Sequence, residues 1–218
     1  MFDRLFGRAG RSTLIDAAFR DINEMLDQAE HMLELGLKAL LDNRQLEVDL
    51  DKLDDVVDEG ERMVRRSVLE HLAFNPKQDL VTSLVLVSMV QDAERLGDFA
   101  RGLPELVPLA RHPRQGPFRD ELRALAERLK PFFPLTREAI SSDDPKKARQ
   151  LMDAVRALRV DLLAYTSKVA ESDLSADMAV VYSGAARSLR RVGAHLSNIA
   201  SSVVQPYDRI RHGDENAT

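Results

Sequence analysis

Three observations in this 218-residue sequence predict an all-α fold. Apolar residues recur every three or four positions over most of the chain, which is the period of an amphipathic helix. No segment alternates polar and apolar residues between hairpin turns, as half-buried strands do. Prolines and glycines are concentrated between the periodic segments, so each segment is long enough for a helix of many turns. The sequence therefore predicts two tandem antiparallel three-helix bundles with six helices in all.

Three helices are expected in the first half of the chain. The first covers about 14–41, where apolar side chains follow the helical period throughout. The second starts near Leu50 and stops before Pro76, because the residue that precedes a proline disfavours helix. The third covers about 76–102 and is apolar on more than one face in its first half, which predicts a central, well-covered helix.

A connector separates the two halves. Residues 102–117 hold four of the nine prolines in the chain, together with two glycines. Such a segment cannot continue a helix and marks a boundary. We therefore expect a first repeat at 12–103, a second repeat at 117–205 and a disordered tail at 206–218.

Three more helices are expected in the second half. The fourth covers about 118–141 and is kinked at Pro131 and Pro134. The fifth begins with Asp144 as N-cap and Pro145 at the first helical position, a favoured arrangement for a helix start. The sixth covers about 175–204 and repeats the period of the third.

Composition excludes several classes of protein. The net charge is −5 and no basic block is present, whereas nucleic-acid binding depends on neutralising phosphates. The absence of cysteine excludes disulfides and thiolate metal sites. The longest apolar run has about 11 residues against the roughly 20 that a membrane-spanning helix needs, and the N-terminus lacks a signal-peptide core. We therefore expect a soluble, cytoplasmic protein that does not bind nucleic acid.

Carboxylates at helical spacing form the first candidate site. Glu94 and Asp98 are four residues apart on the third predicted helix, so they share one face. Glu47 and Asp51 have the same spacing, with Asp54 one turn further on. Neighbouring carboxylates repel unless a cation lies between them, and an all-oxygen ligand set suits magnesium, calcium, manganese or ferric iron. A solvated acidic face is the alternative.

Two equivalent glycines point to a repeat. Gly97 and Gly193 occur at matching places in the third and sixth predicted helices, each one residue after a large apolar side chain. Glycine inside a helix is unfavourable by about 1 kcal/mol relative to alanine. Its presence at both places predicts close approach of a neighbouring helix in each repeat.

Several motifs resemble those of a known family. The run DAERLGDFA at 92–100 is similar to the signature helix of PhoU-type phosphate-uptake regulators. The sixth helix matches the second copy of that motif through His195 and Asn198. The run LDKLD at 50–54 is similar to the acidic pattern of the family's second helix, and Asn75-Pro76 falls where the family has a proline turn.

The resemblance implies a fold, a function and a set of ligands. PhoU-like proteins consist of two three-helix bundles whose acidic motifs hold metal ions. They are cytoplasmic, often homodimeric, and reach the membrane only through partners, namely a phosphate transporter or a phosphate-sensing histidine kinase. Carried over to this chain, the cofactor is iron, manganese, magnesium or calcium in the first repeat. The implied metal ligands are Glu47, Asp51, Asp54, Glu94 and Asp98.

The second repeat departs from this pattern by charge inversion. When 50–57 is aligned with 155–162, two acids of the first repeat, Asp51 and Asp54, are matched by arginines, and matching the third helix with the sixth places an arginine at Glu94 as well. The inverted charge predicts no metal in the second repeat. The arginines either pair with the nearby Asp153 and Asp161 or form an anion-binding pocket, for example for phosphate. These arginines are Arg156, Arg159 and Arg190.

Enzyme motifs are missing from the sequence. No histidine has a glutamate three residues before it, as ferritin-like di-iron enzymes require, and there is no phosphate-binding glycine loop, nucleophile elbow or HExxH run. We expect His195 to be a packed or solvated residue rather than a ligand. The sequence predicts a non-enzymatic regulator that acts by protein–protein contact. The alternatives are a metal-free helical adaptor and, as the weakest, a metal-dependent hydrolase.

Overall fold

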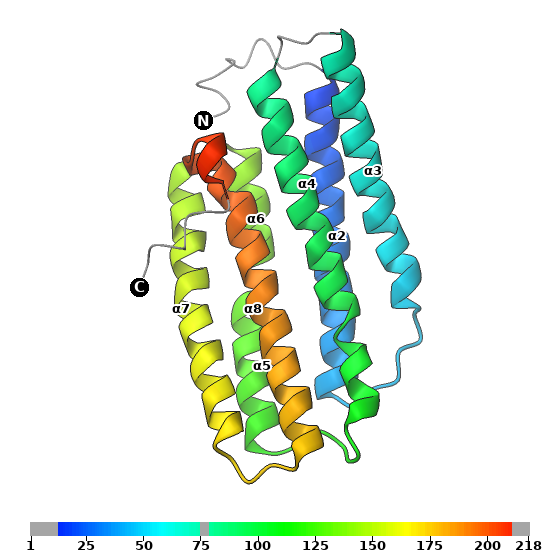
Figure 1. Ribbon diagram of the computed structural model, residues 1–218, viewed down its shortest axis with the longest axis vertical. Helices are drawn as coiled ribbons and strands as arrows, with labels where there is room; N and C mark the ends of the chain where they lie inside the picture. Colours follow the sequence, from blue (N-terminus) through cyan, green and yellow to red (C-terminus); the bar gives the residue numbers. More distant parts are fainter. Residues whose placement is uncertain (1–12, 75–78, 211–218) are drawn as a thin grey trace.

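The chain folds as a bundle of long helices in the computed structural model, which describes residues 13–74 and 79–210 (Figure 1). Within these residues there is no β-strand, and the all-α prediction is confirmed. The helices are α2 (Thr13–Leu41), α3 (Leu50–Phe74), α4 (Leu80–Arg101), α5 (Pro117–Leu129), α6 (Phe132–Ser141), α7 (Pro145–Ala170) and α8 (Ala176–Val204). Two short 3-10 helices, η1 (Pro104–Leu109) and η2 (Tyr207–Arg209), follow α4 and α8.

Burial patterns explain the arrangement of the first three helices. On α3 the buried apolar residues form a single stripe that includes Val57, Val64 and Val68, so one face packs and the rest is solvated. On α4 half of the residues are buried, on several faces, because this helix packs against α2, α3 and α8. The prediction of a central third helix is confirmed.

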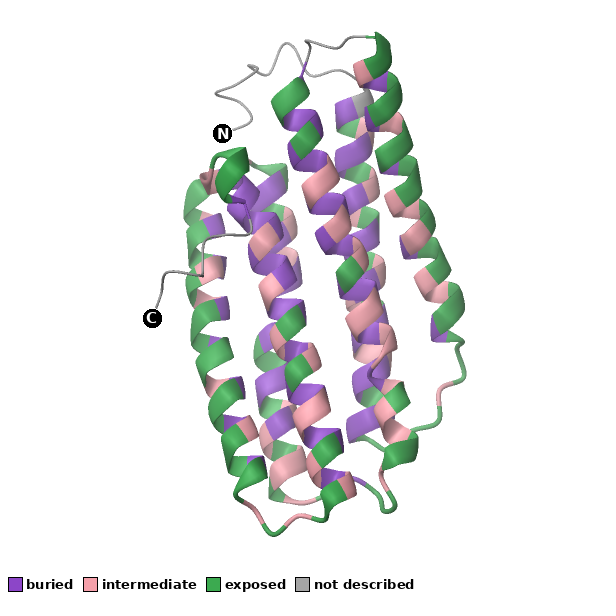
Figure 2. Ribbon diagram, viewed as in Figure 1, coloured by how far each residue is buried: buried purple, intermediate pink, exposed green. Residues whose placement is uncertain are grey.

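The two three-helix units pack into one body. α4 lies against α8 along much of its length, and α2 also contacts α6 (Figure 1). Buried apolar side chains from both units join one continuous hydrophobic core. Figure 2 shows the result: buried residues gather on the central helices, while α3 and α7 at the two sides expose much of their surface.

A helix break occurs where a kink was predicted. Residues 118–141 form two helices, α5 and α6, with Lys130 and Pro131 between them. Pro131 lacks the backbone N–H that a continuous helix would need. Pro134 falls in the first turn of α6, where backbone N–H groups have no intrahelical acceptor, so it is accommodated without a second break.

The start of α7 follows the sequence prediction. The Oδ1 atom of Asp144 accepts hydrogen bonds from the backbone N–H groups of Lys146 at 2.8 Å and Lys147 at 3.4 Å, and Pro145 occupies the first turn. This arrangement satisfies donors that would otherwise lack partners at the helix start.

The connector is fixed to the end of α2. The guanidinium of the buried Arg114 donates hydrogen bonds to the backbone oxygens of Leu40 at 2.8 Å and Ala39 at 2.9 Å. The side chain of Asn43 also accepts from and donates to the backbone of Arg114. These bonds satisfy carbonyl groups at the C-terminus of α2 that have no intrahelical donor.

The segment after α8 begins with ordered structure. Of the tail predicted as disordered at 206–218, the structure describes 206–210, which include η2 and the buried Ile210. Residues 211–218 lie outside the described residues, as does Asn75-Pro76 between α3 and α4.

Candidate functional site

The structure distributes the five predicted metal ligands over two helices and one loop. Asp51 and Asp54 lie on α3, and the next helix carries the other pair. That pair, Glu94 and Asp98, lies one turn apart on α4. Glu47 is exposed in the loop before α3. The predicted helical pairing of Glu47 with Asp51 is therefore wrong, because the helix begins after Glu47.

Gly97 lets α3 and α4 approach closely beside these acids. A Cβ atom placed on Gly97 would lie 2.8 Å from Oδ1 of Asp54 and 3.3 Å from Cγ1 of Val57. Real Cβ atoms do not come so close to an oxygen without a shift of one partner. The predicted close approach is confirmed here, and it brings the carboxylate of Asp54 against the backbone of α4.

An internal cation occupies the middle of this group. Nε of Arg101, at the end of α4, lies 2.8 Å from Oδ2 of Asp54. Its Nη atoms lie 3.4 Å from Asp51, 3.7 Å from Asp98 and 3.5 Å from Glu105. One guanidinium thus bridges carboxylates of both helices. We call the carboxylates of Asp51, Asp54, Asp98 and Glu94 the acidic seam.

Burial shifts the pKa values of Asp54 and Arg101 in opposite directions. Burial raises the pKa of Asp54 above its ordinary value, and this effect outweighs the lowering by Arg101. Burial lowers the pKa of Arg101, but Asp54 and the other acids raise it further, so the net shift is upward. Arg101 therefore offsets the effect of burial on Asp54 only in part.

Glu94 is the acid whose charge is least compensated. Burial raises the pKa of Glu94 to about 7, and the negative charge of Asp98 adds to this shift. Arg95 opposes it, with its Nε 3.4 Å from the Glu94 carboxylate, but Arg95 also donates a 2.8 Å hydrogen bond to Asp98. Glu61 and Asp58 on α3 raise the pKa of Glu94 further. Near neutral pH this side chain therefore gains a proton readily, and a cation would favour its charged form.

The chemistry available to the acidic seam is charge neutralisation. Among the residues that the structure describes, no three His, Asp or Glu side chains converge in the way that metal ligands do. Three acids of the seam, Asp51, Asp54 and Asp98, already form ion pairs with Arg101. In this arrangement a metal ion would have to displace the guanidinium.

The three arginines of the second repeat lie in different surroundings. They are Arg156, Arg159 and Arg190. Nη1 of Arg156 donates to Oδ1 of Asp153 at 2.8 Å, as one alternative predicted. Asp161, the other expected partner, instead accepts from Arg128 of α5 at 2.8 Å. Within the described part of the chain, Arg159 and Arg190 form no ion pair, so the anion-binding alternative remains a prediction.

The register of α7 differs from the alignment made on sequence. A Cβ atom on Gly193 would lie 3.6 Å from Val155 and 3.5 Å from Leu129, which are ordinary contacts. Val155 therefore faces Gly193 as Val57 faces Gly97 in the first repeat. The alignment of 50–57 with 155–162 instead matched Val57 with Leu162, seven residues after Val155. The inferred register is wrong by at least one helical turn. Apolar contacts replace the acid of the first repeat here.

A buried polar cluster at the contact of α4 with α8 was not predicted as a unit. Asp92 is fully buried, and its Oδ1 lies 2.8 Å from Nδ1 of His195 and 3.1 Å from Nδ2 of Asn198. The ring of His195 stacks on that of Phe99, and Cζ of Arg191 lies over the Phe99 ring, 5.5 Å from its centroid. His195 is packed, which is one of the two states predicted for it. The signal was present in the sequence, because all of these residues belong to the two matched motifs.

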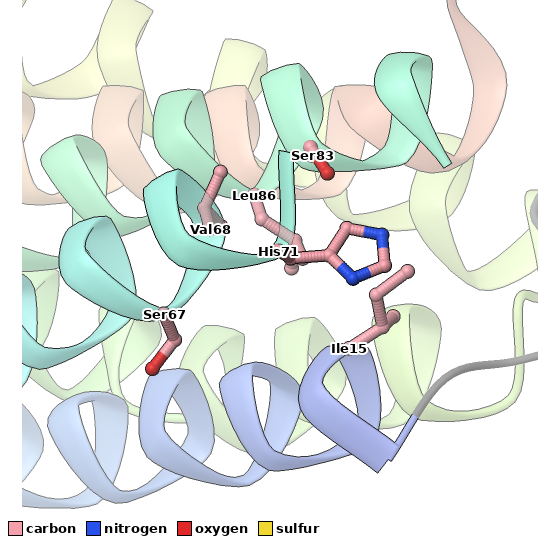
Figure 3. Close-up of a pocket in the computed structure, with 6 residues that line it drawn as sticks. All are labelled: Ile15, Ser67, Val68, His71, Ser83 and Leu86. Atoms are coloured by element: carbon pink, nitrogen blue, oxygen red, sulfur yellow. The ribbon is translucent and has the colours of Figure 1, made fainter. Parts of the chain in front are cut away.

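A small cavity lies where α2, α3 and α4 meet (Figure 3). Figure 3 shows the His71 ring pointing into it from α3, with Ser83 on α4 and Ile15 on α2 around it. Its volume of about 10 Å³ has room for one water molecule and no larger ligand. Nε2 of His71 lies 3.5 Å from the carboxylate of Asp79, which precedes α4. The cavity is therefore structural.

The fold and the acidic seam together define a class: a two-unit α-helical protein with a cation held between carboxylates of its first unit. No helix in the described residues is both long and apolar enough to cross a bilayer. Comparison with known proteins points to a particular family over part of the chain. Residues 22–106 match the PhoU domain family model.

Relatives of known fold and name agree with this assignment. The chain is 25% identical over 192 residues to the phosphate-specific transport system accessory protein PhoU homolog of Synechocystis, covering 84% of this chain and 85% of that protein. The crystal structure of PhoU from Pseudomonas aeruginosa matches with a TM-score of 0.77 and 19% identity over 88% of this chain and 95% of the other. The PhoU structure from Streptococcus pneumoniae matches with a TM-score of 0.77 and 16% identity over 87% and 93%. The resemblance inferred from the motifs is confirmed.

The two equivalent glycines should respond differently to alanine. Alanine favours helix by about 1 kcal/mol over glycine, so Gly193→Ala, which meets only ordinary contacts, should be neutral or stabilise by up to about 1 kcal/mol. Gly97→Ala should destabilise by about 1–2 kcal/mol, because the new methyl group pushes Asp54 away from Arg101. Urea unfolding of both variants measures this difference. Equal effects at the two positions would contradict the close approach at Gly97.

Ionisation of Glu94 should make the protein less stable as the pH rises. Its pKa in the folded chain is about 7, against 4.5 for the ordinary group, so the folded state binds more protons between these values. The free energy of unfolding should fall across this window by about 1–2 kcal/mol from Glu94, after allowance for solvent screening. Urea unfolding at pH 5 and pH 8 should show this loss in wild type and a smaller loss in Glu94→Gln.

The exposed Glu171 provides a matched control, since Glu171→Gln should retain the pH dependence of wild type. The same pH dependence in Glu94→Gln as in wild type would show that Glu94 titrates in its ordinary range.

Proposed function

We propose that this protein restrains phosphate transport and the phosphate-starvation response by direct contact with a phosphate transporter or a phosphate-sensing histidine kinase. The observation that carries the proposal is the PhoU domain match over 22–106. The PhoU homolog of Synechocystis is named as an accessory protein of a phosphate-specific transport system, which supports the same role. The homodimer, the cytoplasmic location and membrane association through the partner alone are further parts of this proposal.

Contact, rather than catalysis, fits the arrangement of the acidic seam. A metal-dependent hydrolase needs an open metal position and a positioned general base. Here Arg101 forms ion pairs with Asp54, Asp51 and Asp98, so the acids that would hold a catalytic metal are engaged. A metal-free helical adaptor is the alternative that the internal cation favours.

The metal predicted in the first repeat is retained only in a restricted form. The carboxylates offer the oxygen ligands that iron, manganese, magnesium or calcium accept, but the guanidinium of Arg101 supplies the positive charge that a metal would supply. The residues therefore do not fit a metal while Arg101 is in place. We propose that Arg101 is the cation of the acidic seam and that metal competes with it.

Deletion of the gene tests the regulatory role. Cells without it should take up radiolabelled phosphate faster than wild type in phosphate-rich medium and should express a starvation-responsive reporter there. Re-expression of the protein should reverse both changes. Unchanged uptake and reporter expression in the deletion strain would contradict the proposal. Phosphatase or nuclease turnover by the purified protein that Glu94→Ala abolishes would instead support the hydrolase.

Metal content tests the role of Arg101. Elemental analysis after incubation with iron, manganese, magnesium or calcium should find little metal in wild type. Arg101→Gln should bind more, because Asp51 and Asp54 of α3 then lose the ion pair with Arg101, and Asp98 of α4 keeps only Arg95. The gain should disappear in Arg101→Gln/Glu94→Ala/Asp98→Ala. One metal ion per chain in wild type, lost in Glu94→Ala/Asp98→Ala, would show instead that metal displaces the arginine.

A further inference from the structure

An open groove follows the outer side of the contact between α2 and α3. It has a volume of about 540 Å³ and lies apart from the acidic seam, which faces α4. Gly60 and Met25 both line the groove, and α3 comes close to α2 between them: a Cβ atom on Gly60 would lie only 2.8 Å from Cγ of Met25. The rim on α3 carries two apolar side chains that solvent reaches, Val56 at 59% and Met63 at 49% exposure.

The groove has the length and shape to receive a helix. Its lining runs from Asp21 to Gln28 on α2 and from Asp55 to Met63 on α3. Seven or eight residue steps along a helix correspond to about 10–12 Å, or two turns. In the described residues α3 packs only on α2 and α4 to any extent, so this side of it is left open. A third helix laid in the groove would cover the apolar rim, as in other helix-in-groove complexes.

The charges around the groove are acidic on both walls. Asp21 and Glu24 line the α2 wall and Asp55 lines the α3 wall, and none of these three forms an ion pair with another described residue. Glu59 also lines the α3 wall but is paired with Arg62, at 2.9 Å. The apolar rim is therefore flanked by three carboxylates that form no ion pair with the described part of the chain.

Repulsion among these acids is visible on α2. Burial raises the pKa of Asp21, and the neighbouring charge of Glu24 raises it further, while Arg20 opposes the shift. A positively charged partner would relieve this repulsion. A second copy of the chain that presented the same groove would bring four more carboxylates against these, so electrostatics disfavour a symmetric dimer here.

We propose that the groove between α2 and α3 binds an amphipathic helix of a partner protein, whose apolar stripe is flanked on both sides by Lys or Arg. The apolar stripe covers Val56 and Met63, and the basic residues pair with Asp21, Glu24 and Asp55. The inference rests on the proposed function in one respect, because both require contact with a partner protein.

A synthetic helical peptide of about 14 residues, with Leu on one face and Lys on both flanks, is the probe. Fluorescence anisotropy with the full chain should show saturable binding. Val56→Ser/Met63→Ser and, separately, Asp21→Lys/Asp55→Lys should each weaken binding by at least about tenfold. Thermal unfolding of each variant should stay close to wild type, because all four side chains lie at the groove opening rather than in the core.

Matched controls separate the groove from general attraction to an acidic protein. Val160→Ser/Val180→Ser removes two apolar side chains that are exposed on α7 and α8. Glu171→Lys/Asp173→Lys makes the same change in net charge at exposed positions of another loop. Both should bind the peptide within about twofold of wild type. Equal weakening by groove and control variants would overturn the proposal.

Two other occupants give distinct results. Residues 1–12 carry Arg4, Arg8 and Arg11 and lie outside the described residues. If a chain lacking 1–12 binds the peptide at least tenfold more tightly, that segment is the occupant and the partner is excluded. If Val56→Ser/Met63→Ser converts a dimer to a monomer in light scattering, the occupant is a second copy. An unchanged affinity and an unchanged oligomeric state support the partner.

The groove and the proposed function can fail separately. In deletion cells, Val56→Ser/Met63→Ser should fail to restrain phosphate uptake, while Val160→Ser/Val180→Ser should restrain it fully. If the groove variant restrains uptake normally, the groove is not the regulatory contact, although the proposed function stands. If the wild-type chain does not restrain uptake, the proposed function fails, and the peptide measurements still decide whether the groove binds a helix.

Discussion

The packing of α4 against α8 is the contact on which the arrangement of both units depends. Asp92 is fully buried in it, and a buried carboxylate is tolerated only with hydrogen-bond donors around it. Two hydrogen-bonding partners, His195 and Asn198, come from the other unit. The first unit therefore buries a carboxyl group to which the second unit supplies hydrogen bonds. Because α4 also carries the acidic seam on its opposite side, this contact fixes the helix that positions Glu94, Asp98 and Arg101.

In the acidic seam, α4 provides both the close approach to α3 and the positive charge that this approach requires. Gly97 allows α3 to come close enough for Asp54 to touch the α4 backbone, and this closeness concentrates negative charge. Arg101, one turn after Gly97, returns a positive charge to the same place. Glu94 lies one turn in the other direction and receives less compensation, which its raised pKa reflects. Negative charge is thus neutralised by Arg101 at the end of the seam that holds Asp54, and is less well neutralised at the end that holds Glu94.

Most of the fold could be predicted from the sequence, whereas the site could be predicted only in part. Helix boundaries depend on local chemistry, so Asp144 and Pro145 marked the start of α7 correctly. The prediction for Glu47 was wrong because a spacing of four residues can also be counted in a loop, and α3 starts only at Leu50. Arg101 was missed because its partners are up to 50 residues away in the sequence. Ion pairs between helices depend on their rotation and register, and no local pattern encodes these.

The bonds from Arg114 to the end of α2 bear on the order in which the molecule is completed during synthesis. The carbonyl groups of Ala39 and Leu40, near the end of α2, accept hydrogen bonds from Arg114, which is synthesised 74 residues after Leu40. Until the ribosome has passed the whole connector, the first helix ends in carbonyl groups that only water can satisfy. The end of α2 is therefore incomplete even when all three helices of the first unit have emerged, and Arg114 in the proline-rich connector and then Arg123 in α5 supply its last donors.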